Sequence, residues 1–233
     1  MNLDIVCFNI HKGVGWGVHK STIHRIKHQI HESHADIILL QEVRGAQFEF
    51  LASELWPHFS YGRNAVYQKG HHGNAILSKY PIIYSDNIDL SMTRYERRGL
   101  LHSMVQLPGH HRVLHLLCVH LGLLAKDRRK QLDIIVRYLE NNISSSDPLI
   151  LGGDFNDWRG YATKPLINHF GLQEAFKLCK NKYAKTYPAW APVLQLDRVY
   201  FRGFSVVSAN RMTKSPWRNL SDHIALNVLL NIE

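Results

Sequence analysis

The sequence predicts an α/β fold in which two β-sheets pack face to face and helices cover their outer sides. Two observations lead to this prediction. Short apolar runs of strand length recur along the whole chain, and only a few segments between them have helical spacing. The chain has 233 residues and no linker rich in Pro, Gly or Ser, so we expect a single domain over residues 1–233.

Ten segments are expected to be strands because large apolar residues are concentrated in them. The first, residues 3–8, begins so early that no signal peptide is expected before it. The other nine, in order, are residues 36–41, 73–78, 82–89, 100–107, 112–119, 149–152, 195–201, 204–209 and 224–230. No apolar stretch approaches the roughly 18 residues that a membrane-spanning helix needs.

Three segments have the spacing of amphipathic helices. Residues 21–34 carry isoleucines on one face, and Ser21 or Thr22 is expected to cap the N-terminus. Residues 44–55 and 126–140 are the second and third helices. The third is expected to bury Leu132, Val136 and Leu139.

The composition favours an anionic partner. The formal charge is +9 with sixteen histidines counted as neutral, which suits nucleic acid, anionic lipid or inositol phosphate. Cys7 and Cys118 lie inside apolar strand runs, and the third cysteine, Cys179, gives an odd number without metal-ligand spacing. Free thiols in a reducing compartment are therefore expected, which indicates the cytoplasm.

The most informative segment follows the apolar run 149–151, which ends at two glycines and then Asp154 and Asn156. An apolar run that stops at two glycines indicates a buried strand ending where the backbone turns tightly. The two polar side chains are two residues apart and would project to one side of an extended chain. They could hold a water, a metal or a phosphate oxygen, or they could satisfy local backbone groups in an Asx-turn.

Polar side chains of catalytic type also lie at the edges of other apolar runs, most of them where a run ends and the last pair just before a run begins. These are Asn9, Gln41-Glu42, His120, Asp197 and Asp222-His223. Acidic groups, amides and histidines at the ends of core strands are the parts used in metal-assisted phosphoryl chemistry.

The ordered set resembles the endonuclease/exonuclease/phosphatase superfamily, which includes pancreatic-type deoxyribonuclease, abasic-site endonucleases, neutral sphingomyelinases and inositol-phosphate 5-phosphatases. The matching pieces occur in the family's order from residue 9 to residue 223, with residues 73–78 and 196–198 among them. Residues 61–64, 71–74 and 98–101 further resemble a compact bacterial subfamily. The resemblance implies a four-layer α/β/β/α sandwich of the deoxyribonuclease I-like type, with two mixed, mostly antiparallel sheets.

The resemblance also implies a metal site. Glu42 is the expected main ligand, completed or supported by Asn9 and Asp222. A hard carboxylate suits Mg²⁺, and Mn²⁺ can substitute because it is also a hard, oxygen-seeking ion. A strand-end glutamate on the surface is the alternative for Glu42.

In the same way, His223 is expected to be a general base or acid whose other ring nitrogen is held by Asp197. Asp154 would position or deprotonate the attacking water, and Asn156 would donate to a phosphate oxygen. His120 would stabilise charge or protonate the leaving oxygen. The abasic-site endonucleases lack a histidine at that position, which argues against a role in base-excision repair.

Two further residues are expected to bind substrate. Asn74 either fixes the site geometry or contacts phosphate. Arg98 can bind a phosphate as a planar, doubly hydrogen-bonding cation, but an ion pair with Glu96 competes with that role.

We therefore expect a Mg²⁺-dependent phosphoesterase that hydrolyses phosphodiester bonds, most simply a nuclease of low sequence specificity, since no base-reading motif is present. The alternative is a phosphatase or phospholipase-C-like enzyme acting on a phospholipid head group or inositol phosphate. Loop tryptophans would then form a membrane-facing rim: Trp56, Trp158, Trp190 and Trp217. A non-catalytic binding module is disfavoured because no principal site group is missing.

Overall fold

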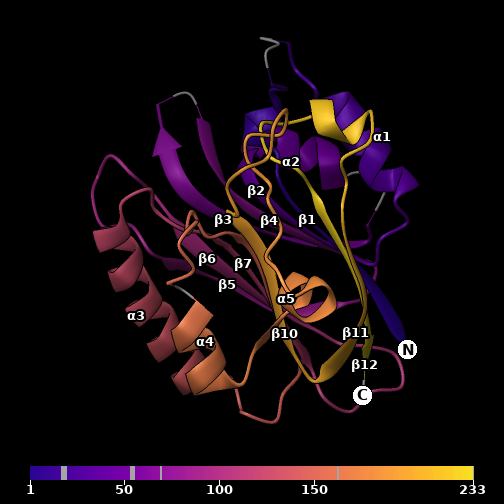
Figure 1. Cartoon of the computed structure of the whole chain (residues 1–233), viewed down its shortest axis with the longest axis vertical. Helices are drawn as coiled ribbons and strands as arrows, with labels where there is room; N and C mark the ends of the chain where they lie inside the picture. The colour runs from indigo at the N-terminus through magenta and orange to yellow at the C-terminus, as the bar shows by residue number, and fades with distance from the viewer. Residues whose placement is uncertain (17–19, 53–55, 69, 162, 233) are drawn as a thin grey trace.

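The computed structural model describes residues 1–16, 20–52, 56–68, 70–161 and 163–232, and these form two six-stranded sheets (Figure 1). In spatial order, the first sheet contains β11 (Phe204–Arg211), β12 (Leu226–Ile232), β1 (Asn2–Asn9), β2 (Ile37–Arg44), β4 (Gly70–Ser78) and β3 (His58–Tyr67). The second contains β5 (Ile82–Asp89), β6 (Gly99–Val105), β7 (Leu114–His120), β8 (Leu149–Asp154), β10 (Asp197–Arg202) and β9 (Gln173–Glu174). Both sheets are mixed, because β1 pairs with β2 and β7 pairs with β8 in parallel while the other pairs are antiparallel.

Helices cover the outer faces of both sheets. On one side of the molecule lie α1 (Ile23–Glu32) and α2 (Gly45–Ala52), and on the other lie α3 (Ala125–Asn142) and α4 (Thr163–Phe170) (Figure 1). The short helix α5 (Ala175–Lys180) follows β9, and single 3₁₀ turns occur at η1 (His11–Gly13) and η2 (Trp217–Asn219). Among the described residues, no helix is both long and apolar enough to cross a membrane.

Alternation along β1 shows how the layers form. Leu3, Ile5 and Cys7 belong to the apolar layer between the sheets, whereas Val6 and Phe8 point to the opposite face, toward α1 and α2. All five are fully buried, and burying a side chain of this size stabilises the fold by about 1.5–3 kcal/mol. The predicted four-layer α/β/β/α sandwich is therefore confirmed.

Helix α3 packs on the outer face of the second sheet through Leu132, Ile135 and Leu139. The prediction that Val136 is buried there was wrong, because Ile135 takes the core-facing position and Val136 is half-buried. At α1, Thr22 is the N-cap residue as predicted, but its hydroxyl donates to the Leu220 carbonyl oxygen at 2.7 Å instead of accepting from the helix.

Several elements were not predicted: β3, β9, α4 and α5. Strand β3 contains Gly62 and Asn64, which normally indicate a turn, and a register shift between Arg63 and Ala65 leaves Asn64 as an extra residue in the ladder. The helix expected over residues 44–55 is α2, which ends at Ala52; residues 53–55 lie outside the described part of the chain.

The two glycines of β8 are required by close packing and not by a turn, so the predicted tight turn there was wrong. The strand continues through both glycines to Asp154. A Cβ atom on Gly152 would lie 2.6 Å from Leu39 Cδ1 of the facing sheet. A Cβ atom on Gly153, whose φ is +150°, would lie 1.9 Å from the Val119 carbonyl oxygen. These glycines let β8 approach both its neighbour and the first sheet.

The strand register gathers polar strand ends at one edge. Asn9 is paired with Gln41 where β1 and β2 run parallel, and His120 is paired with Asp154 where β7 and β8 run parallel. Asp154 is in turn paired with Asp197, the first residue of antiparallel β10. Parallel strands end at the same edge of a sheet, so residues far apart in sequence become neighbours.

A second polar cluster lies beneath α3, away from this edge. His102 Nε2 and His115 Nδ1 are 2.9 Å apart, the other nitrogen of His102 is 2.8 Å from the Tyr138 hydroxyl, and His115 Nε2 is 3.6 Å from Asp147. Both histidines are buried. The chain of contacts ties β6 and β7 to α3 and to the loop before β8.

Replacing Gly153 by alanine should lower the free energy of unfolding by about 3 kcal/mol or more, since strain and overpacking add. The matched change Gly109→Ala, in a turn with φ +72° and no atom near the new Cβ, should cost about 1 kcal/mol. Urea denaturation of both variants measures the difference. Equal costs would contradict the proposed packing role of Gly153.

The histidine cluster should make the fold acid-sensitive. Burial and the neighbouring His115 lower the pKa of His102 to about 4, and burial also lowers the pKa of His115. The unfolded chain, with an ordinary histidine pKa of 6.5, then binds more protons, so this stabilisation is complete above pH 6.5 and is lost as pH falls toward 4. In urea titrations at pH 7 and pH 5, the uncharged variant His102→Gln should lose less stability on acidification than the wild type.

Candidate active site

A cleft of about 420 Å³ opens at the edge where the polar strand ends gather. Seven of the ten predicted site residues line it: Glu42, Arg98, His120, Asp154, Asn156, Asp222 and His223. The other three, Asn9, Asn74 and Asp197, lie beneath these and are each no more than 1% exposed.

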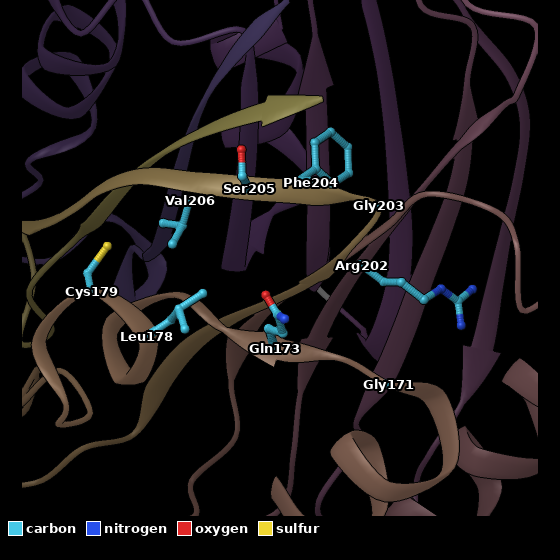
Figure 2. A pocket seen from close by; sticks show the side chains of 9 residues that line it. All are labelled: Gly171, Gln173, Leu178, Cys179, Arg202, Gly203, Phe204, Ser205 and Val206. Carbon is cyan, nitrogen blue, oxygen red and sulfur yellow. The ribbon is translucent and has the colours of Figure 1, made fainter. Parts of the chain in front are cut away.

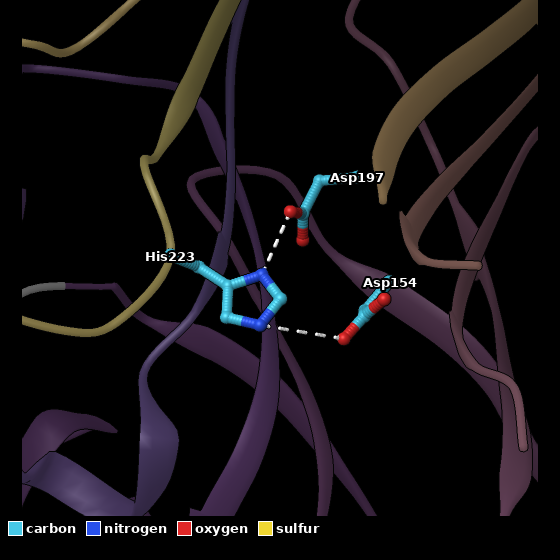
Figure 3. Close-up of side chains that lie close together, drawn as sticks. All are labelled: Asp154, Asp197 and His223. Carbon is cyan, nitrogen blue, oxygen red and sulfur yellow. Dashed lines mark hydrogen bonds and ion pairs between the residues drawn. The ribbon is translucent and has the colours of Figure 1, made fainter. Parts of the chain in front are cut away.

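His223 and Asp197 form the predicted contact. His223 Nδ1 lies 2.8 Å from Asp197 Oδ2, and both side chains are buried (Figure 3). His223 precedes β12 of the first sheet and Asp197 begins β10 of the second, so the contact joins the two sheets. With Asp197 at Nδ1, the other ring nitrogen, Nε2, faces Asp154.

One oxygen of Asp154 is the meeting point of the site. Asp154 Oδ2 accepts a hydrogen bond from the Asn9 side-chain amide at 3.0 Å and lies 3.5 Å from His120 Nε2 and 3.7 Å from His223 Nε2. The last two distances exceed a direct hydrogen bond. A water or phosphate oxygen placed between these three atoms could therefore contact all of them.

The other Asp154 oxygen is used locally. Asp154 Oδ1 accepts from the Asn156 backbone N–H at 2.9 Å, which is the predicted alternative, an Asx-turn. The Asn156 side-chain amide donates to the Leu121 carbonyl oxygen at 2.9 Å. Asn156 also lines the cleft. It therefore makes local hydrogen bonds and is at the same time open to a ligand.

The charges of His223 and Asp154 are set by each other. Burial opposes charge on His223, but Asp197 and Asp154 overcome it and raise the pKa of the imidazole to about 10. Burial raises the pKa of Asp154 to about 6, while the positive charge of His223 limits the rise. The mutual attraction of the two groups favours the pair in which His223 is charged and Asp154 is ionised.

His120 is in the opposite state to His223. Burial, helped by the positive charge of Arg98, lowers the pKa of His120 to about 3, so its ring is neutral at neutral pH. Burial alone would raise the pKa of Glu42, yet nearby positive charge lowers it to about 2. The positive groups near Glu42 are His120 when protonated, Lys12, whose Nζ lies 3.6 Å from Glu42 Oε2, His11 and His223. Because His120 is neutral at neutral pH, the charge there comes from the others, Lys12 first among them.

Glu42 and Asp222 have the chemistry of ligands for a hard divalent ion. Both carboxylates line the cleft, and a bulge in β2 between Leu40 and Val43 gives Glu42 a φ of +57°. Mg²⁺ takes few protein oxygens and keeps several waters, so two carboxylates fit it. The oxygen of Asn9 accepts from the His11 backbone N–H at 3.0 Å and has a second lone pair.

A different set is closer together. Among the residues that the structure describes, the acidic and histidine side chains whose ligand atoms all lie within 4.8 Å of one another are Asp154, Asp197 and His223. Asp197 and His223 are already hydrogen-bonded to each other, which suits acid–base chemistry. The cleft thus offers both a buried acidic–histidine group and, in Glu42 and Asp222, two more exposed carboxylates.

The two predicted substrate-binding residues differ in placement. Asn74 is fully buried, and its amide donates to the carbonyl oxygens of Gly99 and Cys118 at 2.9 and 3.0 Å. It therefore connects β4 of one sheet to β6 and β7 of the other and does not line the cleft. Arg98 does line it, and it also makes the competing ion pair, with Nη2 3.0 Å from Glu96 Oε1.

Sequence reasoning missed His11 and Lys12. They follow β1 in left-handed conformations, with φ of +46° and +53°, and both line the cleft. His11 Nδ1 lies 3.6 Å from Asp222, and Lys12 reaches Glu42. Non-glycine residues with positive φ are costly and persist where the surroundings fix them, often at functional sites. The sequence did contain a signal for them: a histidine and a lysine follow the end of the first strand and precede Gly13.

A second hollow does not have the features of an active site. It has a volume of about 460 Å³ and lies at the turn between β10 and β11, the opposite end of β10 from Asp197 (Figure 2). Its charged lining residue, Arg202, donates to the backbone carbonyl oxygens of Ser144, Asp147 and Phe170. The guanidinium is thus used in holding loops together.

Comparison with known proteins gives consistent matches over nearly the whole chain. The model of the Endonuclease/Exonuclease/phosphatase family matches residues 6–223. The uncharacterized protein YbhP of Escherichia coli (strain K12) is 37% identical over 246 residues, which cover 99% of this chain and 97% of that protein.

Solved structures share the fold at low identity. The human Nocturnin catalytic domain, solved with a bound sulfate anion, has a TM-score of 0.83 at 20% identity and covers 100% of this chain and 95% of that one. An endonuclease/exonuclease/phosphatase from Bacteroides vulgatus has a TM-score of 0.81 at 19% identity, with 100% of both chains covered. TDP2 from D. rerio, complexed with single strand DNA product, has a TM-score of 0.77 at 18% identity, with 99% of both covered.

Replacing Asp197 by asparagine should lower the pKa of His223 from about 10 toward its ordinary value of 6.5, because Asp197 is the strongest group favouring the charged ring. NMR titration of the imidazole in the metal-free protein measures this. Asp133→Asn, on the exposed side of α3, is the control and should leave the titration unchanged. A His223 titration that is the same in both variants would show that the contact does not set its charge.

Proposed function

The chain belongs to the endonuclease/exonuclease/phosphatase family, a family of hydrolases, and on that premise we propose that it is a divalent-metal-dependent phosphodiesterase acting on nucleic acid with low sequence specificity. The observation that carries the proposal is the convergence of His120 and His223 on one oxygen of Asp154, with Asp197 behind His223. This arrangement supplies a base, a proton donor and a neutral hydrogen-bond donor around one small space.

In the proposed mechanism, ionised Asp154 orients the attacking water and accepts its proton. The His223 imidazolium, held through Nδ1 by Asp197, stabilises the negative charge of the transition state and returns a proton to the departing oxygen. His120 is neutral and donates a hydrogen bond to a phosphate oxygen. Asn156 supports the same oxygens, and Asn74 keeps the two sheets in register beneath the site.

A divalent ion would be held by Glu42 and Asp222 with support from Asn9, and it would neutralise charge on the phosphate and on the leaving oxygen. Mg²⁺ is the proposed ion, and Mn²⁺ has the same preference for oxygen ligands. Lys12 and His11 lie beside these carboxylates, with Lys12 Nζ 3.6 Å from Glu42 and His11 Nδ1 3.6 Å from Asp222, and both line the cleft that would receive the phosphate.

Nucleic acid is the proposed substrate because the chain carries a formal charge of +9 and places Lys12 and Arg98 in the cleft lining. The rim of four tryptophans expected for a lipid enzyme is incomplete, since Trp56 and Trp217 are buried. A phospholipid or inositol phosphate substrate is therefore less well supported. The free cysteines Cys7, Cys118 and Cys179 support a reducing location, for which we propose the cytoplasm.

His223→Ala should reduce Mg²⁺-dependent nicking of a supercoiled plasmid and hydrolysis of bis(p-nitrophenyl) phosphate by a factor of about 10² or more, the usual contribution of an acid–base residue. His111→Ala, an exposed histidine in the turn between β6 and β7, is the matched control. Circular dichroism should show both variants folded. A folded His223→Ala protein with near-normal turnover would contradict the assigned role.

The same assays test the metal. EDTA should abolish turnover, and added Mg²⁺ or Mn²⁺ should restore it, because Glu42 and Asp222 would then lose and regain the ion proposed to neutralise charge on the phosphate. Turnover that survives chelation would contradict a metal-dependent mechanism.

A further inference from the structure

The cleft lining is not only polar. Five apolar or aromatic side chains line it beside the charged groups: Leu123, Trp158, Tyr187, Leu194 and Leu196. Trp158 is 45% exposed and Leu123 is 67% exposed, although both lie next to buried catalytic groups. Large apolar side chains left open beside a reaction centre indicate that an apolar part of the ligand covers them.

Trp158 is held firmly although its ring is half-exposed. Its own carbonyl oxygen accepts from Gln195 Nε2 at 3.1 Å, and the carbonyl oxygen of the preceding residue, Asp157, accepts from Arg198, which is fully buried. The Arg159 guanidinium lies over the indole, 4.5 Å from the ring centroid. The backbone at residues 157–158 is thus held by hydrogen bonds from Gln195 and Arg198, and the indole is presented on a supported segment.

A second aromatic pair involves a segment whose two ends line the cleft. The segment from Tyr187 to Leu194 closes on itself, with the Tyr187 carbonyl oxygen accepting from the Leu194 N–H at 2.8 Å, and both end residues line the cleft. Trp190 within this segment stacks on Trp16, with ring centroids 6.0 Å apart and an interplanar angle of 19°. Trp190 and Trp16 are 53% and 46% exposed.

Flat, ordered aromatic rings with arginine beside them bind unpaired bases. Base–aromatic stacking contributes about 1–3 kcal/mol per base, and arginine adds a cation–π contribution. In a duplex the faces of each base are covered by its neighbours, so a stacking side chain next to the scissile phosphate can act only on a base that is out of the helix. The cleft volume of about 420 Å³ suits a ligand group of this size.

We propose that the cleft takes single-stranded nucleic acid, with the base next to the scissile phosphate stacked on Trp158 and the phosphates drawn by Lys12 and Arg98. Trp190 and Trp16 would receive a further base along the strand. This inference rests on the proposed function and names its substrate class. An anionic membrane, into which the exposed aromatic and leucine side chains would insert, is the competing partner for the same side chains.

Binding in EDTA tests the inference without catalysis. A fluorescein-labelled 12-nucleotide single strand should bind more tightly than the same strand in duplex. Trp158→Ala should weaken single-strand binding about tenfold, within the range for one stacked base, and Trp158→Phe should recover most of it. Leu178→Ala, which removes a 55% exposed leucine of α5 beside the second hollow, is the control and should bind like wild type.

Equal affinity for single strand and duplex, or no effect of Trp158→Ala, would overturn the inference. It would also be overturned if vesicles of phosphatidylglycerol and phosphatidylcholine bound the wild type and the single strand did not. Hydrolysis of bis(p-nitrophenyl) phosphate separates the two proposals. If this diester is cleaved with Mg²⁺ but strand preference is absent, only the inference fails. If no diester is cleaved while the single strand still binds through Trp158, the proposed function fails and the binding site remains.

Discussion

The buried carboxylate of Asp154 is the group on which the arrangement of the site depends. Asn9 comes to it from the first sheet, His120 from the second, and His223 from the segment before β12. A buried charge left without partners is costly, and removing one partner of a buried ion pair typically costs about 3–5 kcal/mol. A shift of one sheet relative to the other would separate Asp154 from Asn9 and His223, so the geometry of the site and the stability of the fold are linked.

The strand register explains why so many polar groups meet there. Parallel pairing ends β1 beside β2 and β7 beside β8, and antiparallel β10 begins at the residue opposite Asp154. The absence of side chains at Gly152 and Gly153 lets β8 lie against Leu39 and the Val119 carbonyl at contact distance. The Asn74 side chain, on the first sheet, donates hydrogen bonds to the carbonyl oxygens of Gly99 and Cys118 on the second. These bonds also hold the two sheets at a fixed separation.

Sequence reasoning succeeded where a local pattern determines the structure. The strands with both faces buried, such as β1 and β8, read as continuous apolar runs, and the family resemblance supplied the contact of Asp197 with His223. It failed where the decisive factor is non-local. Strand β3 is held by pairing with β4 despite its turn-like residues, and the depth of Asn74 depends on how the two sheets meet. The left-handed turn that aims Lys12 at Glu42 has no periodic signature.

The two histidines of the site, His120 and His223, differ in charge although they face the same carboxylate. Both Nε2 atoms lie within 4 Å of the same Asp154 oxygen, yet Asp197 keeps His223 charged while burial and Arg98 keep His120 neutral. If Asp197 were absent, His223 would lose the strongest group that favours its charged form, although Asp154 and Asp222 would still favour that form. Asp197 thus helps to keep His223 charged beside Asp154, although it does not itself line the cleft.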